Sequence, residues 1–231
     1  RFEGLSELGP RGDAIVEADW CLGELKKTLE AEGIIDNTLI IFSSDNGPVL
    51  NDGYYDDSDV KNGDHRPSGP LRGGKYSLFE AGTRVPFFTY WNGKIKPGVS
   101  DSMVSQLDLL SSLAQLVGSE VTTADSLPLL ELLMGQSDEG RDEMVIEATS
   151  RTAFKRGDWV MIPPYEGPAV NDKVQIELGN DSDFQLYNLT EDIEQQNNLA
   201  ALKPDKLQEM LKAFEAIRGD DYGKIEKLEL K

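Results

Sequence analysis

An apolar run that stops at an Asp-Asn-Gly turn is the feature that most constrains the fold of this chain. The run is Leu39–Phe42, and the turn is Asp45-Asn46-Gly47. Consecutive rather than alternating apolar residues predict a strand over Thr38–Ser44 with both faces buried, which is typical of a parallel sheet covered by helices. Because ligands of open α/β sheets collect at the carboxyl ends of strands, the turn is a candidate site.

Further patterns predict helices and a strand around this element. Apolar residues recur at helical spacing over Asp13–Glu32 and over Ser102–Val117, and Gly33 follows the first helix where a left-handed cap belongs. A strand is predicted over Arg84–Trp91, with Pro86 favouring an irregular start. The apolar positions of the two helices are Ile15, Ala18, Leu22, Leu25 and Leu29, and Val104, Leu107, Leu110, Leu113, Ala114 and Val117. Residues 1–140 are therefore expected to form a large α/β domain.

A small α+β subdomain with an antiparallel sheet is predicted over residues 141–231. A hairpin is expected around Arg156-Gly157-Asp158, and the helix Pro204–Arg218 has proline in its first turn and Gly219 at its end. The predicted strands are Met144–Ala148, Arg151–Lys155, Trp159–Ile162 and Phe184–Leu189.

The composition excludes several classes of protein. The net charge is -19 and the pI about 4.4, which argues against a nucleic-acid partner. The single cysteine, Cys21, rules out an internal disulfide and a multi-cysteine zinc site. No stretch approaches the roughly 20 apolar residues that span a bilayer. The chain begins at Arg1 with no visible leader, so we expect it to be a piece of a longer protein.

Asp45 and Asn46 are candidate metal ligands. A carboxylate and an amide carbonyl are hard oxygen donors that suit Ca²⁺ or Mg²⁺ better than Zn²⁺. Successive strand side chains point to opposite faces, so both can reach one ion only if the backbone turns, which Gly47 permits. The alternative is a simple turn that closes a strand.

The segment Arg72-Gly73-Gly74-Lys75 is a candidate anion-binding loop. Its glycines permit close approach of the backbone, and the lysine ammonium is a compact charge that suits a tetrahedral oxyanion. The alternative is an exposed basic turn. The segment is not a P-loop, because the Walker spacing and the following Ser or Thr are absent.

The order of these motifs resembles that of the formylglycine-dependent type I sulfatases, the arylsulfatase family of the alkaline phosphatase superfamily. The resemblance extends from about Asp13 to Ala200. It rests on the segments GIIDNTLIIFSSDNG, GPLRGGKYSLFEAGTRVPFFTYWNGKIKPGVSD, VSQLDLLSSLAQLVG, FKRGDWVMI and QLYNLTEDIEQQNNLA. It implies part of an alkaline-phosphatase-like sheet with flanking helices, and a sulfuric ester hydrolase acting on a sulfated small molecule or sulfated glycan.

The resemblance also implies roles for individual residues. Asp45 and Asn46 match the Asp-Asn pair that coordinates the family's calcium ion, with Mg²⁺ the second choice. Lys75 matches the catalytic lysine that contacts the sulfate group. In such enzymes a hydrated formylglycine attacks sulfur, while metal and lysine stabilise charge on the sulfate oxygens.

The sequence departs from the family pattern at the nucleophile. The family makes formylglycine from Cys or Ser in a Cys/Ser-x-Pro-x-Arg motif, whereas Cys21 begins no such motif and lies inside a predicted helix. We expect that motif, and the remaining metal ligands, in an N-terminal half of the same protein. The chain alone is then expected to be inactive and to self-associate through exposed apolar edges. The family implies a periplasmic or secreted location.

Other residues carry open alternatives. His65 is either a substrate contact at the rim of the cleft or a solvent-exposed loop residue, and Arg72 is a second candidate substrate contact. Four aspartates lie in the loop after the predicted strand: Asp52, Asp56, Asp57 and Asp59. They could suggest a second calcium site, but a solvated loop is favoured because the EF-hand spacing is absent. Tyr54 and Tyr55 could stack on a sugar or aryl group. The competing functions are a phosphatase or phosphonate hydrolase of the same superfamily and a non-catalytic stand-alone fragment.

Overall fold

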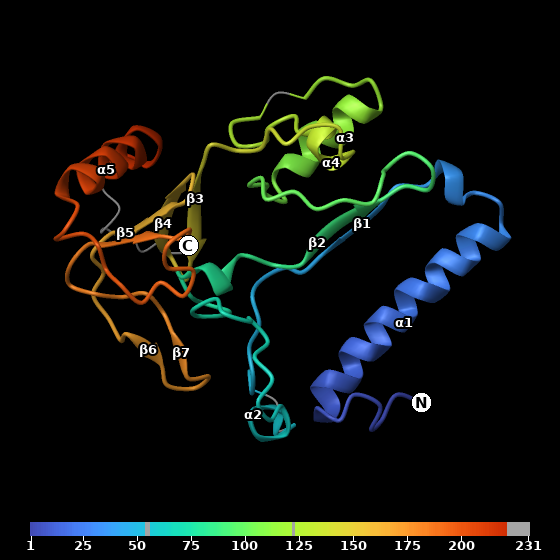
Figure 1. Ribbon diagram of the computed structural model, residues 1–231, viewed down its shortest axis with the longest axis horizontal. Coiled ribbons are helices and arrows are strands. Elements are labelled where there is room, and N and C mark those ends of the chain that lie inside the picture. The colour runs from blue at the N-terminus through green and yellow to red at the C-terminus, as the bar shows by residue number, and fades with distance from the viewer. Residues whose placement is uncertain (54–55, 122, 221–231) are drawn as a thin grey trace, which may run out of the picture. The chain divides into compact units, whose positions relative to one another are not determined.

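A computed structural model describes residues 1–53, 56–121 and 123–220 of the chain (Figure 1). The chain divides into two compact units. The first contains Arg1–Asp19, Ser44–Val85 and Glu143–Lys231, and the second contains Trp20–Ser43 and Pro86–Asp142. Helices and strands occur in both, which confirms the predicted mixed α/β class. The predicted domain boundary between residues 140 and 141 stays a prediction.

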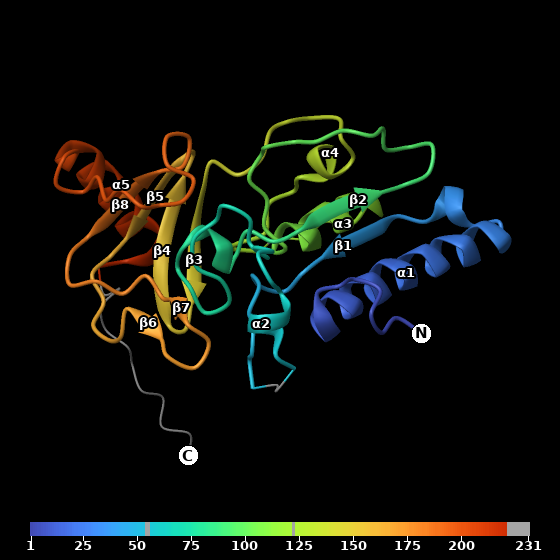
Figure 2. The ribbon, with the colours of Figure 1, turned by 60° about the horizontal axis from the view of Figure 1, so that its bottom comes forward.

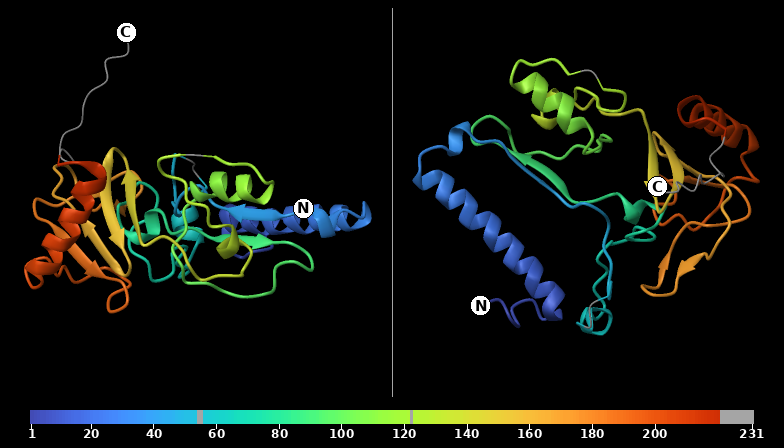
Figure 3. Two further views of the ribbon diagram at one scale, coloured as in Figure 1. Left: turned by 90° about the horizontal axis from the view of Figure 1, so that it is seen from above. Right: turned by 180° about the vertical axis from the view of Figure 1, so that it is seen from behind.

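The long helix α1, Gly9–Ala31, runs from the first unit into the second without interruption (Figure 3). The other elements of the first unit are α2 (Ser58–Lys61), η2 (Glu80–Gly82), β3 (Glu143–Ala148), β4 (Arg151–Arg156), β5 (Trp159–Ile162), β6 (Val170–Asn171), β7 (Ile176–Glu177), β8 (Gln185–Asn188) and α5 (Pro204–Arg218). Those of the second unit are η1 (Ile35–Asn37), β1 (Ile40–Ser43), β2 (Phe87–Tyr90), α3 (Asp108–Leu116) and α4 (Leu130–Leu133).

The C-terminal sheet and its helix form as predicted. The strand order is β3-β4-β5-β8 and every pair is antiparallel. Gly157 adopts a φ of 53° in the turn between β4 and β5, a conformation that glycine reaches without strain. Figure 2 shows α5 lying against this sheet, and Met210 and Phe214 from α5 are buried among residues of β4, β5 and β8.

A second apolar cluster fixes the segment that follows Lys75. Leu78 and Phe79 are 1% and 2% exposed and join side chains of the four-stranded sheet. Phe79 meets the ring of Tyr187 edge-on, with 6.0 Å between the ring centroids. The candidate anion-binding loop is therefore anchored in the core of the first unit.

The helix α1 begins four residues before the predicted start at Asp13. Gly33 has a φ of 68° and its nitrogen donates to the carbonyl oxygen of Glu30, which confirms the predicted left-handed cap. The predicted apolar stripe is not buried, because Ile15 and Leu25 are 55% and 50% exposed. None of the helices in the described part of the chain is long and apolar enough to span a membrane.

The parallel pairing predicted for the Thr38–Ser44 strand is wrong. β1 pairs with β2 in antiparallel register, Ile40 opposite Tyr90 and Ser43 opposite Phe87 (Figure 3). All four residues of β1 are only half-buried. With one partner strand among the residues that the structure describes, β1 keeps an open edge, and consecutive apolar residues do not reveal the direction of a neighbour.

The helix predicted over Ser102–Val117 begins only at Asp108. The Asp108 carboxylate is fully buried, accepts from the backbone nitrogen of Ser105 and forms a bidentate pair with Arg141. The side of the helix that contacts the rest of the protein carries Ser111 and Ser112, which hydrogen-bond the segment 126–129. The sequence had predicted that an apolar face would make this contact. Two of the predicted face residues, Leu107 and Leu110, remain exposed.

Candidate functional site

The Asp45-Asn46-Gly47 turn follows directly after β1 and lies in the first unit. Asp45 is exposed and Asn46 half-buried. Oδ1 of Asp45 accepts a hydrogen bond from the backbone nitrogen of Asn46 (2.9 Å), and the Asn46 amide nitrogen donates to the carbonyl oxygen of Gly47 (2.9 Å). Neither bond uses Oδ2 of Asp45 or the amide oxygen of Asn46, which makes these two oxygens the candidate ligands.

The Lys75 loop is tied at both ends to one short segment. Arg72 donates two hydrogen bonds to the carboxylate of Glu177, at 2.8 and 2.6 Å. Ser77 Oγ donates to the carbonyl oxygen of Glu177 (2.6 Å). The backbone nitrogen of Leu78 donates to the carbonyl oxygen of Leu178 (3.1 Å). These bonds fix the residues on each side of Lys75, so the lysine sits on an ordered loop.

Close backbone contacts bring the turn and the loop together. The backbone nitrogen of Lys75 donates to the carbonyl oxygen of Pro48, directly after the turn (3.0 Å). The backbone nitrogen of Gly47 donates to the carbonyl oxygen of Gly82 in η2 (2.9 Å). A Cβ atom at Gly47 would lie 1.6 Å from the carbonyl oxygen of Ala81, and one at Gly74 would lie 2.5 Å from that of Pro48. Only glycine allows this approach, which agrees with the use predicted for Gly74, whereas Gly47 was expected to permit a backbone turn.

The ammonium of Lys75 has a carboxylate partner that the sequence did not indicate. Its Nζ lies 2.6 Å from Oδ2 of Asp52, and the Tyr76 hydroxyl donates to the same carboxylate (2.9 Å to Oδ1). The hydrogen bond from Lys75, with that from Tyr76, lowers the pKa of Asp52. The hydrogen bond to Asp52 in turn raises the pKa of Lys75. Both groups are therefore charged at neutral pH.

Arg72 is held by protein groups on several sides. Besides Glu177, its guanidinium donates to the carbonyl oxygen of Gln195 (2.6 Å) and lies 4.0 Å from the ring centroid of Phe79. The bidentate pair lowers the pKa of Glu177. This arrangement gives Arg72 a structural task, and its predicted contact with substrate stays a prediction.

His65 is exposed and shares a shallow polar cleft of about 360 Å³ with Arg72. Glu177, Glu194 and Gln196 also line this cleft. The backbone nitrogen of His65 donates to the carbonyl oxygen of Asn62 (3.1 Å), and its own carbonyl accepts from the Asn62 side chain. The site residues thus form two groups, Asp45, Asn46 and Lys75 at the glycine contacts, and His65 with Arg72 at the cleft.

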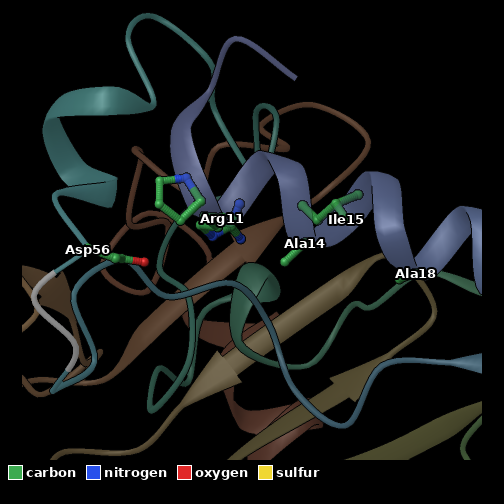
Figure 4. A pocket seen from close by; sticks show the side chains of 6 residues that line it. Arg11, Ala14, Ile15, Ala18 and Asp56 are labelled. Atoms are coloured by element: carbon green, nitrogen blue, oxygen red, sulfur yellow. The ribbon is translucent and has the colours of Figure 1, made fainter. Parts of the chain in front are cut away.

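A larger hollow of about 410 Å³ lies elsewhere in the first unit (Figure 4). Arg11, Ala14, Ile15 and Ala18 line it from α1, and Asp56 faces them from the loop that follows β1. Its lining is mostly apolar and contains none of the predicted site residues, so it has no part in the candidate site.

The donor set at the turn fits part of a site for a hard cation. Asp45 and Asn46 offer two oxygen ligands, whereas Ca²⁺ takes about six to eight. Within residues 1–53, 56–121 and 123–220, no three His, Cys, Asp or Glu side chains gather in a way that could hold a metal ion. The second calcium site, already less favoured by the sequence than a solvated loop, therefore finds no support among the described residues of the Asp52 loop. Tyr54 and Tyr55 lie outside the described residues.

Two contributors to the site escaped the sequence prediction. Asp52 had been grouped with the solvated aspartates, and no local pattern separates it from Asp56 or Asp57. Glu177 anchors Arg72 from 105 positions away, and no periodicity signals such a pair. The only available indication in the sequence would have been the number of acidic residues near each basic residue.

Comparisons with known proteins find one matching family model and several similar relatives. The family model described as Sulfatase matches residues 4–119, half of the chain. The chain is 40% identical over 222 residues to an N-acetylgalactosamine-6-O-sulfatase of Bacteroides thetaiotaomicron. The aligned region covers 94% of this chain and 43% of that protein. The chain therefore spans less than half the length of this relative.

Solved structures show the same likeness. A Bacteroides thetaiotaomicron structure described with the metabolism of multiple glycosaminoglycans matches with a TM-score of 0.90 and 40% identity, over 94% of this chain and 46% of that one. The phosphonate monoester hydrolase of Agrobacterium radiobacter matches with a TM-score of 0.57 and 19% identity, over 90% and 40%. The second likeness concerns the fold alone.

Proposed function

Because this chain belongs to the sulfatase family, we propose that it forms the C-terminal part of a longer enzyme that hydrolyses sulfate esters. One observation carries the proposal. The glycine-lined contact between the turn at Asp45 and the loop at Lys75 joins two oxygen donors and a fixed ammonium in one region of the first unit. This combination suits an anionic ester bound beside a divalent cation.

Each residue has a proposed task. Asp45 and Asn46 would hold the cation, Ca²⁺ in preference to Mg²⁺, through their side-chain oxygens. When bound, the cation supplies positive charge to the sulfate oxygens. Lys75 donates hydrogen bonds to a sulfate oxygen from its ordered loop, and its charge favours the more negative transition state over the substrate.

The nucleophile is proposed to come from outside this chain. Cys21 begins no Cys-x-Pro-x-Arg motif and is exposed on α1. The one Ser-x-Pro-x-Arg match, Ser68-Gly69-Pro70-Leu71-Arg72, is not assigned the nucleophile, because its arginine is paired with Glu177 in the loop that carries Lys75. A formylglycine residue, the remaining metal ligands and a second set of sulfate contacts would therefore belong to an N-terminal part of the same protein. This chain alone is then expected to be inactive.

We propose a sulfated glycan as the substrate. The relative from Bacteroides thetaiotaomicron is named for 6-O-sulfated N-acetylgalactosamine, which makes a 6-O-sulfated amino sugar the first compound to test. The exposed His65 and the polar cleft beside it offer hydrogen-bonding groups suited to sugar hydroxyls. A sulfated aryl compound is the second choice, and a periplasmic or secreted location is proposed from the family alone.

A phosphatase or phosphonate hydrolase remains the competing enzyme. The likeness to the phosphonate monoester hydrolase supports the shared fold and leaves the reaction open. Sulfate monoesters carry one negative charge and phosphate monoesters carry up to two, so the two classes separate in turnover rather than in fold.

The test compares turnover by the longer protein and by this chain alone. The substrates are 6-O-sulfated N-acetylgalactosamine, p-nitrophenyl sulfate and p-nitrophenyl phosphate, with Ca²⁺ present. We expect sulfate release by the longer protein only, a loss of at least about a hundredfold for Lys75→Ala, and no measurable turnover for Asp45→Ala. Lys212→Ala, an exposed lysine on α5, is the matched control.

Three outcomes would contradict the proposal. Faster turnover of the phosphate ester would favour the competing hydrolase. Wild-type activity in Asp45→Ala would remove the metal role. A longer protein without activity on any ester would favour the non-catalytic alternative, in which the fragment serves only as a scaffold.

A further inference from the structure

Asp52 and Tyr76 surround the ammonium of Lys75. Asp52 Oδ2 lies 2.6 Å from Nζ, and the ammonium lies 5.2 Å from the ring centroid of Tyr76. The Tyr76 hydroxyl bonds both oxygens of the Asp52 carboxylate, at 2.9 and 3.2 Å. The three side chains thus form a closed set of contacts, in which each touches the other two.

The backbone at Tyr76 is unusual for a large side chain. Its φ is 76°, in the left-handed region that favours glycine, and a bulky residue there is strained. Side chains of neighbouring residues normally diverge, yet Lys75 and Tyr76 reach the same carboxylate from adjacent positions. The strained residue is held in place by core residues that follow it, Leu78 and Phe79.

Resting on the proposed function, we propose that Asp52 and Tyr76 are positioning residues that hold Lys75 for the sulfate group. A lysine ammonium has three N–H donors. With one donor on Asp52, two remain for sulfate oxygens, and the flexible four-carbon stem is fixed before the substrate arrives. Neither residue needs to touch the substrate for this task.

The opposite possibility is that Asp52 competes with the substrate for Lys75. A competing carboxylate would have to leave when sulfate binds, so its removal would increase affinity for the anion. The bracing of Asp52 by the Tyr76 hydroxyl and the half-buried state of both Asp52 and Lys75 favour a fixed partner instead.

The test is a double-mutant cycle between Asp52 and Lys75 in the longer enzyme, with p-nitrophenyl sulfate as substrate. We expect Asp52→Ala to lower kcat/KM about tenfold, chiefly through kcat. Asp52→Asn keeps an acceptor oxygen near Nζ and should stay within about threefold of wild type, and Tyr76→Phe should lose about threefold. Asp59→Ala, an exposed carboxylate in the same loop, should leave kcat/KM unchanged.

The cycle separates positioning from a merely structural role. If Asp52 acts through Lys75, Asp52→Ala should cost less than about twofold in a Lys75→Ala background. An equal loss in both backgrounds would overturn the proposal. So would an Asp52→Ala enzyme that turns over substrate as fast as the wild type, or faster, and is inhibited more tightly by inorganic sulfate. Lys75→Ala with full activity would overturn the proposed function as well, whereas an impaired Lys75→Ala beside a normal Asp52→Ala would overturn the positioning proposal alone.

Discussion

Replacing Gly47 by alanine tests the contact on which the site depends. The added Cβ would lie 1.6 Å from the carbonyl oxygen of Ala81 and 2.7 Å from its carbonyl carbon. Ordinary contact begins at about 3.4 Å, so the turn and η2, which follows the Lys75 loop, must separate by roughly 2 Å. Both obstructing atoms belong to the backbone and cannot move aside as a side chain would.

The expected size of the effect follows from that displacement. Misplacing a group in an active site by about 1 Å can cost roughly a hundredfold in rate, so we expect Gly47→Ala to lower kcat/KM at least a hundredfold. Overpacking costs about 1–3 kcal/mol, and loss of the bond from Gly47 to Gly82 about 1 kcal/mol. The free energy of unfolding should therefore fall by about 2–4 kcal/mol.

The assay measures p-nitrophenyl sulfate turnover and urea unfolding of the longer protein. The matched control is Gly98→Ala, because Gly98 is exposed and an added Cβ there would meet only the Lys96 carbonyl oxygen, at 4.0 Å. This control should keep wild-type turnover and stability. If Gly47→Ala were as active and stable as the control, the close approach of the turn and η2 would be refuted.

Two further predictions concern stability. Arg141→Ala leaves the buried carboxylate of Asp108 without its bidentate partner and should lower the free energy of urea unfolding by about 3–5 kcal/mol. Arg156 pairs with Glu143 on the surface, so Arg156→Ala should lower it by less than about 1 kcal/mol. Equal effects of the two variants would contradict the role of burial. The pKa of Glu177 is lowered by Arg72, so the pair stabilises the fold above the ordinary pKa of 4.5, and this stability is lost as pH falls below it through the lowered folded-state pKa. Glu177→Gln should therefore flatten the decline in unfolding free energy below pH 4.5, and an unchanged acid limb would count against the pair.

The sequence predicted those parts of the fold and site that depend on local chemistry. The helix Pro204–Arg218 has its proline, apolar stripe and terminal glycine within one segment, and α5 has those bounds. The hairpin between β4 and β5 was marked by Gly157. Gly74 was correctly associated with close backbone approach, whereas Gly47 was expected only to let the backbone turn, and its close approach to Ala81 was not predicted.

The parts that depend on distant partners could not be read from the sequence. The antiparallel direction of β1 depends on β2, more than forty residues later in the chain. The late start of α3 depends on Arg141, which holds Asp108 in a buried position. The pairing of Lys75 with Asp52 crosses a polar loop whose aspartates look alike in the sequence.

The calcium content of the longer protein tests the central claim most directly. After exhaustive dialysis against metal-free buffer and return of Ca²⁺, isothermal titration and elemental analysis should find a tightly bound ion in the wild type and in Asp101→Ala, an exposed control. The Asp45→Ala/Asn46→Ala variant should lose that ion while keeping the wild-type circular dichroism spectrum. Retention of the ion with unchanged affinity in this variant would contradict the assignment of the turn as a metal site.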